Sequence, residues 1–218
     1  MNPVVLADKA LFDIPPIDYS AIAPILILLV VAVVSVLVEA FLPKGARRPV
    51  QLVLVFGALI AAFVDVVTLS GMRTITASGS ISIDGPALVM QGAILILAGL
   101  GAMLMAERLV VPSGDAFAAR ASALPGSEDE KQFTARGYFQ TEVWPLFLFS
   151  VAGMLLFVSA NDLLLMFVAL EVMSLPLYLL VGMARRRRLL SQEASLKYFL
   201  LGAFSSAFFL YGSALIYG

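Results

Sequence analysis

The stretch "LLLMFVALEVMSLPLYLLVGMA", residues 163–184, is an apolar run that holds one carboxylate, Glu171, and one proline, Pro176. About 20 residues in a helix cross the ~30 Å of hydrocarbon in a membrane. The apolar residues are continuous rather than alternating, and a helix satisfies its own backbone hydrogen bonds in lipid. The stretch therefore predicts a transmembrane helix with an acid in its interior.

Further apolar runs of similar length occur along the chain. Its 61% hydrophobic and 13% charged residues and its mean hydropathy of +0.99 are typical of a membrane protein. We expect an all-α, polytopic bundle of about six transmembrane helices, at 21–42, 50–69, 87–106, 143–160, 163–184 and 194–217. Residues 1–20 are not expected to be a signal peptide, because they lack a basic start and carry three aspartates.

The chain divides into three predicted parts. Residues 1–106 comprise an outer N-terminal segment and the first three helices. Residues 107–142 are polar and include "SALPGSEDEKQ", a composition that predicts a flexible cytoplasmic loop. Residues 143–218 comprise the last three helices, which carry the candidate functional acid and lysine.

Basic residues predict the orientation, because loops rich in lysine and arginine are retained in the cytoplasm. With the N-terminus outside, eleven of the 14 Lys and Arg residues fall in cytoplasmic connections, whereas only Lys9 and Arg73 fall outside. The "RRRR" run at 185–188 is interpreted as a topology anchor near anionic lipid headgroups. Membrane lipids are thus expected partners, and the composition gives no case for nucleic acid.

The chain contains neither cysteine nor histidine. Disulfides, metal sites built on thiolate or imidazole, and the usual axial ligands of haem are therefore excluded. We expect no cofactor in this chain, so any redox chemistry has to belong to a partner.

Glu171 is the most informative ionisable residue. It lies nine residues after Asp162 and fourteen before Arg185, hence ~13 Å below the outer end of its helix. A charged group inside a membrane helix is costly, and burial favours its neutral form. A carboxyl group that is stable both charged and neutral is suited to relaying protons, so we predict that role for Glu171.

Three neighbours support this interpretation of Glu171. Ser174 and Tyr178 follow at helical spacing and predict a hydroxyl-bearing face that holds water beside the carboxylate. Pro176 cannot donate a backbone hydrogen bond to the Val172 carbonyl, which favours a kink and frees that carbonyl for water. The alternative for Pro176 is a kink that serves packing alone.

Lys197 has two interpretations on residue types alone. Glu193 precedes it at the spacing of a helical ion pair, and a snorkelling lysine explains its place about one turn inside the sixth predicted span. On a helical wheel its side bears large apolar residues, whereas Gly202 and Ser206 mark close helix contact on the opposite side. Upright helices would separate Lys197 from Glu171 by ~15 Å, too far for a direct ion pair.

Two further acids, Glu39 and Asp65, lie close to the ends of predicted spans. Both are expected to reach headgroup water, so their favoured interpretation is structural.

The segment "LEVMSLPLYLLVGMARRRRLLSQEASLKYFLLGAFSSAFFLYGSALIYG", residues 170–218, resembles subunit N of the bacterial respiratory NADH:quinone oxidoreductases, the complex I family. The resemblance extends to the "IDYSAIAPILILL" start, to the helix order and to the predicted orientation. The loop at 107–142 does not belong to the family pattern and is interpreted as a lineage insertion.

This resemblance implies a fold, a function and partners. The fold is the first part of a fourteen-helix, antiporter-like bundle of two inverted repeats, so we expect the chain to be part of a longer protein. Its implied role is proton translocation in the bacterial cytoplasmic membrane, with Glu171 as the key proton-path carboxylate and Lys197 as an intramembrane base. Partners are other membrane subunits of the complex, neighbouring antiporter-like subunits included, and NADH, flavin, iron–sulfur clusters and quinone are expected on partner subunits.

Two alternatives stay open at this point. A subunit of a multi-subunit cation/proton antiporter would share the ancestral fold. A membrane scaffold without transport would use Glu171 only as a packed, hydrogen-bonded acid.

Overall fold

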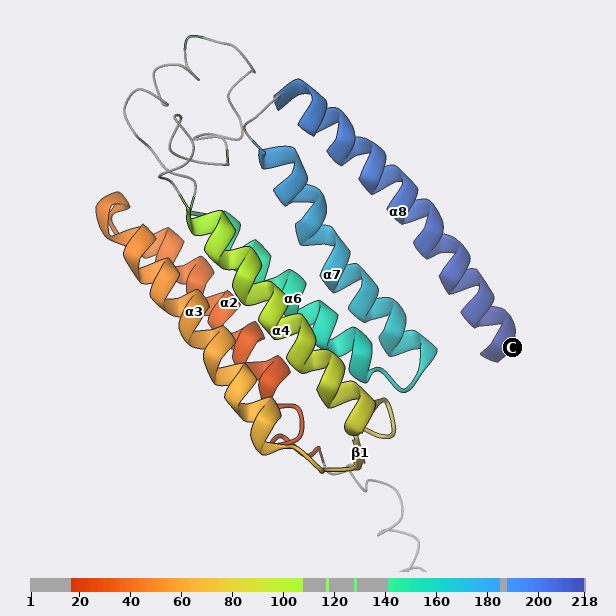
Figure 1. Cartoon of the computed structure of the whole chain (residues 1–218). Coiled ribbons are helices and arrows are strands. Elements are labelled where there is room, and N and C mark those ends of the chain that lie inside the picture. The colour runs from red at the N-terminus through yellow and green to blue at the C-terminus, as the bar shows by residue number, and fades with distance from the viewer. Residues whose placement is uncertain (1–16, 108–116, 118–127, 129–140, 185–187, 218) are drawn as a thin grey trace, which may run out of the picture.

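The computed structural model describes residues 17–107, 117, 128, 141–184 and 188–217. In this part of the chain it is a bundle of long helices with one short β-hairpin at an end (Figure 1). The helices are α2 (Ala23–Phe41), α3 (Lys44–Thr68), α4 (Gly85–Ala106), α6 (Val143–Ser159), α7 (Leu163–Met183) and α8 (Arg188–Tyr217). The hairpin pairs β1 (Thr74–Thr76) with β2 (Ile81–Ile83). The predicted all-α membrane bundle is confirmed.

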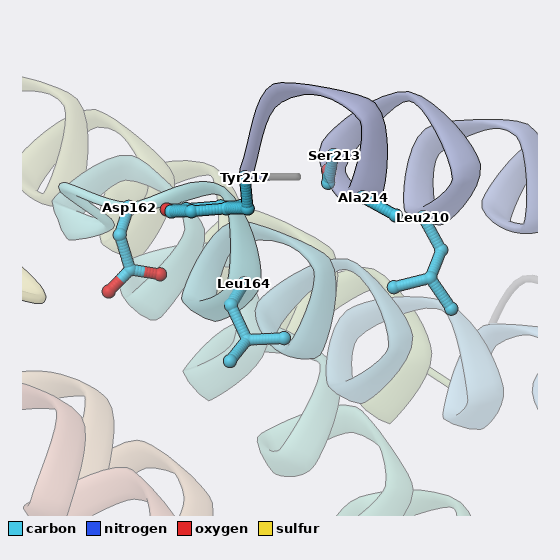
Figure 2. A pocket seen from close by; sticks show the side chains of 6 residues that line it. All are labelled: Asp162, Leu164, Leu210, Ser213, Ala214 and Tyr217. Carbon is cyan, nitrogen blue, oxygen red and sulfur yellow. The ribbon is translucent and has the colours of Figure 1, made fainter.

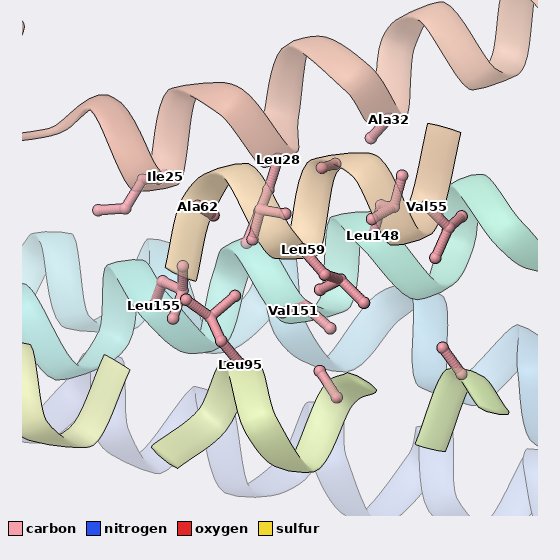
Figure 3. Packing of buried hydrophobic residues seen from close by; sticks show 14 of the residues in the cluster. Ile25, Leu28, Ala32, Val55, Leu59, Ala62, Leu95, Leu148, Val151 and Leu155 are labelled. Atoms are coloured by element: carbon pink, nitrogen blue, oxygen red, sulfur yellow. The ribbon is translucent and has the colours of Figure 1, made fainter. Parts of the chain in front are cut away.

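The helix α6 lies at the centre of the bundle and packs against α2, α4 and α7. Its Leu148 and Leu155 are fully buried and meet Leu28 of α2 and Leu95 of α4 in one core (Figure 3). Five of the described helices have the length and hydropathy of membrane spans, whereas α6 has 17 residues. At 1.5 Å per residue α6 is still ~25 Å long, so we interpret it as a span surrounded by the other helices.

Two helices begin six residues earlier than the sequence predicts. The helix α3 begins at Lys44 and runs through Pro49, because Arg47 and Arg48 in its first turns bind Glu39 and the Ala106 carbonyl. The helix α8 begins at Arg188 and has 30 residues. At ~45 Å it exceeds the hydrocarbon thickness, so its polar first turns extend the span beyond the apolar run that defined the prediction.

Glu39 belongs to a buried polar network at the end of the bundle where α3 begins. Its carboxylate accepts hydrogen bonds from Arg47 (2.9 Å), Thr141 (2.6 and 2.7 Å) and Gln51 (3.3 Å). Gln51 also donates to the Ser35 carbonyl at 2.9 Å and accepts from the Ser35 hydroxyl. The Glu39 side chain is only 13% exposed, so the expectation that it reaches headgroup water is replaced by an acid satisfied inside the protein.

The β-hairpin was not predicted from the sequence. Its strands have three residues each, and the turn between them places Ala77, Ser78 and Gly79 at positive φ. Ile83 of β2 is fully buried. Asn161 donates its backbone N–H to the Ser80 carbonyl at 2.8 Å and its side-chain amide to the Gly79 carbonyl at 2.7 Å. The hairpin therefore fixes the connection between α6 and α7, and with it the start of the helix that carries Glu171.

The loop predicted at 107–142 falls almost entirely outside the described residues, as do Arg185–Arg187 of the basic run. Of the described positions in that loop, Phe117 forms a backbone bridge with Ala184 at the end of α7.

Candidate functional site

The start of α7 sets the depth of Glu171 in the bundle. Asp162 caps this helix by accepting a 2.6 Å hydrogen bond from the Leu165 N–H. That bond and a second one from the Ser80 side chain hold the pKa of Asp162 below its usual value. A charged Asp162 also suits the positive end of the helix dipole. Glu171 follows two and a half turns later and is half-buried.

The contact between α6 and α7 is unusually close beside Glu171. A Cβ placed on Gly153 would lie 2.5 Å from the Met173 nitrogen and 2.9 Å from the Val172 carbonyl carbon. The Ser150 hydroxyl donates to the Met173 carbonyl at 2.9 Å. Pro176 lies buried within the continuous helix α7, three residues further on. The Val172 carbonyl, which receives no hydrogen bond from Pro176, therefore lies close to α6.

The contact between α7 and α8 is built on Tyr178. Its ring meets Tyr198 and Phe199 edge to face at centroid distances of 4.6 and 5.7 Å. A Cβ on Gly202 would overlap the Tyr178 hydroxyl, and Ser195 donates to the Tyr178 carbonyl at 2.6 Å. The prediction that Gly202 marks close helix contact is confirmed.

The contacts of α7 with α8 define where Glu171 points. Phe167, Tyr178 and Gly182 all touch α8 and lie within about 40° of Glu171 around α7. Phe167 stacks on Phe209, and Gly182 lies against Ser195. The two helices are antiparallel, so the residue numbers of any two residues at the same level add up to nearly the same value. Glu171 therefore lies on the α8-facing side of α7, level with the buried Ser206.

Ser206 was recognised from the sequence only as a small residue for close packing. The register between α7 and α8 puts Ser206 opposite Glu171. This register cannot be predicted from any motif in the sequence. The repeat of small residues that includes Gly202, Ser206 and Ser213 was the available signal.

The two predicted hydroxyl neighbours of Glu171 have other partners. Ser174 donates to the Leu170 carbonyl at 2.6 Å, and Tyr178 fills the contact with α8. Within the described residues, the Glu171 carboxylate has neither a hydrogen bond nor an ion pair. Glu171 is therefore a half-buried acid without a partner in this part of the chain.

Lys197 lies on the outward side of α8. It forms an ion pair with Glu193 at 2.5 Å, and both side chains are more than half exposed. Leu201, Phe204 and Phe208 on the same side are exposed as well, whereas Ser206 and Ser213 are buried. Lys197 and Glu171 are about nine residues apart along the paired helices, or ~13 Å. The structure therefore keeps the two residues apart, in agreement with the sequence prediction.

Asp65 is partly exposed near the end of α3, so the expectation that it reaches water is met for only part of its carboxylate. One of its carboxylate oxygens is buried and has no hydrogen-bond partner among the described residues, and the other accepts a 3.4 Å bond from Thr68. Asp65 forms no hydrogen bond with Glu171 or Lys197. The described residues contain no cluster of acids suited to a metal ion.

A hollow of about 430 Å³ lies between the start of α7 and the end of α8. Figure 2 shows its lining, in which Asp162, Ser213 and the Tyr217 hydroxyl are the polar groups beside Leu164, Leu210 and Ala214. Glu171 lies nine residues along α7 from Asp162, so this hollow does not contain the candidate acid.

We expect Gly202→Ala to weaken the α7–α8 contact, because its methyl group would overlap the Tyr178 hydroxyl. Overpacking of this kind typically costs about 1–3 kcal/mol. Tyr178→Phe removes the obstructing oxygen, so the double variant should recover part of the loss. Thermal unfolding of the four purified full-length proteins completes the double-mutant cycle, and strictly additive effects would contradict this contact.

A family profile described as "NADH:quinone oxidoreductase/Mrp antiporter, TM" matches residues 160–218, which are the helices that carry Glu171 and Lys197. NADH-quinone oxidoreductase subunit N of Mycobacteroides abscessus is 54% identical over 98% of this chain. The chain belongs to the subunit N family of NADH-quinone oxidoreductases. The resemblance inferred from residues 170–218 is confirmed.

Other members of the family match as well. Subunit N of a Parafrankia strain is 56% identical, again over 98% of this chain. A chain of the structure of respiratory complex I from Thermus thermophilus with bound aureothin is 33% identical and superposes with a TM-score of 0.65 over 89% of this chain. This chain spans about two-fifths of the length of these subunit N relatives, 42% and 41%, and 36% of the solved chain.

Proposed function

We propose that the full-length protein is a membrane-arm subunit of a proton-pumping NADH:quinone oxidoreductase, in which Glu171 takes up and releases a proton. The observation that carries this proposal is Glu171 itself, an acid in the interior of a membrane helix with no partner among the described residues. Glu39 is satisfied by its neighbours, whereas Glu171 has neither a hydrogen bond nor an ion pair among the described residues. The subunit N similarity supports the same assignment.

Glu171 would act through changes in the charge around it. In a low dielectric an unpaired carboxylate is costly, so a cation brought near favours the charged form and its withdrawal favours the protonated form. Quinone reduction elsewhere in the complex would drive that rearrangement of charge along the membrane arm. The α8 contact at Ser206 offers a hydroxyl at the same level for the proton path.

Lys197 would be a base on the inward side of Glu171. Its ion pair with Glu193 has to open before Lys197 exchanges a proton, and both side chains are exposed enough to do so. The ~13 Å between Lys197 and Glu171 requires water or further side chains as a bridge. We place the N-terminus outside and the basic connections in the cytoplasm, in the bacterial cytoplasmic membrane, on the distribution of Lys and Arg.

The proposed complex supplies what this chain lacks. NADH, flavin, iron–sulfur clusters and quinone would bind partner subunits, and neighbouring antiporter-like subunits and membrane lipids would contact this one. Residues 1–106 would serve as the first helical group, residues 107–142 as a connecting segment and residues 143–218 as the proton-handling group.

A second candidate function is that of a subunit in a multi-subunit cation/proton antiporter, because the matching family profile includes Mrp antiporters in its description. Capture of the full-length chain by an affinity tag from mild detergent distinguishes the two. We expect the captured complex to oxidise NADH with a quinone acceptor. Capture of intact antiporter subunits without that redox activity would favour the second function.

A further inference from the structure

A second surface of the bundle, far from Glu171 in the fold, has the form of a ligand site. Between α3 and α4 lies an outward-facing groove of about 310 Å³. Only apolar residues line it, with Phe56, Ile60 and Phe63 on α3 and Leu95, Gly99 and Met103 on α4 among them. Gly99 has no heavy atom within 4 Å of where its Cβ would stand, so the groove is open at that point.

Cations lie above one end of this groove. Arg48 of α3 donates a 3.0 Å hydrogen bond to the Ala106 carbonyl at the end of α4, so its guanidinium joins the two helices that form the groove. Arginine has five donor hydrogens, and this bond uses one of them. Lys44 is exposed one turn earlier on the same side of α3. Arg48 has no ion pair among the described residues, so its charge is not neutralised there.

The depth of the groove below Arg48 is similar to the thickness of one membrane leaflet. Along α3, Phe56 lies ~12 Å from Arg48 and Phe63 lies ~22 Å from it. Along α4, Met103 lies ~5 Å from Ala106 and Leu95 lies ~16 Å from it. One leaflet contributes about half of the ~30 Å hydrocarbon core. The groove therefore occupies the depth of an acyl chain whose headgroup lies at Arg48.

We propose that the α3–α4 groove binds an acyl chain of an anionic phospholipid whose headgroup is held by Arg48. Basic sites between membrane helices bind anionic headgroups, and the uninterrupted apolar lining suits a hydrocarbon chain. The order of cation and then apolar groove is the order of phosphate and then acyl chain in the lipid. Arg47 does not take part, because it is paired with Glu39 inside the bundle.

Photo-crosslinking in native membranes tests this site in the full-length, assembled protein. A benzophenone amino acid replaces Leu100, which lines the groove and is 54% exposed, or Leu97, which is 67% exposed on the same helix outside it. Mass spectrometry then reads the headgroup of each lipid adduct. We expect adducts at Leu100 to be about fivefold richer in anionic phospholipid than adducts at Leu97.

Two further variants separate the headgroup from the chain. Arg48→Gln should abolish the anionic enrichment at Leu100. Gly99→Leu should lower the yield of lipid adduct there by filling the groove, whereas Gly57→Leu, also at a glycine without neighbours within 4 Å, should not. If Arg48→Gln prevents assembly, the pair of glycine variants decides the test. Equal lipid composition at Leu100 and Leu97, or a protein subunit as the main adduct at Leu100, would overturn the proposal.

Discussion

Gly153→Ala is expected to separate α6 from α7 and to destabilise the protein strongly. Alanine is ordinarily a better helix former than glycine by about 1 kcal/mol, so the intrinsic effect favours the variant. Here, however, the new methyl carbon would lie 2.5 Å from the Met173 nitrogen and 2.8 Å from its Cα. These are backbone atoms, which cannot swing away as a side chain does. Relief therefore requires movement of a whole helix, at a cost of at least about 1–3 kcal/mol.

The matched control for Gly153→Ala is Gly57→Ala on α3, where no heavy atom lies within 4 Å of the new methyl group. We expect Gly57→Ala to be at least as stable as the parent, and Gly153→Ala to lose folded protein. Thermal unfolding of the solubilised full-length protein, with the yield of assembled complex as a second readout, compares them. Equal behaviour of the two variants would show that α6 and α7 are not packed as described.

Glu171→Gln is expected to stop NADH-driven proton translocation through this subunit while the complex still assembles. Glutamine matches glutamate in size but cannot take up or release a proton near neutral pH. Because the Glu171 carboxylate has no hydrogen bond or ion pair within the described residues, the substitution removes no such contact there. Proton uptake by inverted membrane vesicles, normalised to NADH oxidation, measures the effect.

Two companion variants sharpen that experiment. Glu193→Gln makes the same chemical change in an exposed acid of α8, so we expect it to lower the ratio of protons to electrons less than Glu171→Gln does. Lys197→Ala should lower the ratio as well, because it removes the proposed base on the inward side. Full pumping by both Glu171→Gln and Lys197→Ala in assembled complexes would contradict the proton-path proposal and favour the interpretation as a scaffold.

The apolar runs sufficed to predict the helices, because each membrane span needs a similar length of uninterrupted hydrophobic sequence. Hydropathy was a poor guide where polar residues continue a helix, so the starts of α3 and α8 were each placed six residues late. The hairpin was missed because "TIT" and "ISI" are too short for their alternation to be distinctive. The glycine of the turn "ASG" between them was the available signal.

The candidate site was predicted in part. Depth along one helix identified Glu171, and the wheel of α8 correctly separated the Lys197 side from the Gly202 side. What one helix cannot predict is its partner, since register depends on the packing of two. The sequence therefore gave no sign that Ser206 lies opposite Glu171, that Gly153 approaches Met173, or that Glu39 is satisfied by Arg47, Gln51 and Thr141 instead of by water.

The most direct test of the central claim is infrared difference spectroscopy of the assembled complex, comparing the resting state with the state under NADH turnover. A carboxylic acid and a carboxylate absorb separately, so a change in protonation of Glu171 produces a paired signal. We predict that this signal is present in the parent, persists in Glu39→Gln and disappears in Glu171→Gln. A signal that survives unchanged in Glu171→Gln would contradict the assignment of Glu171 as the group that takes up and releases the proton.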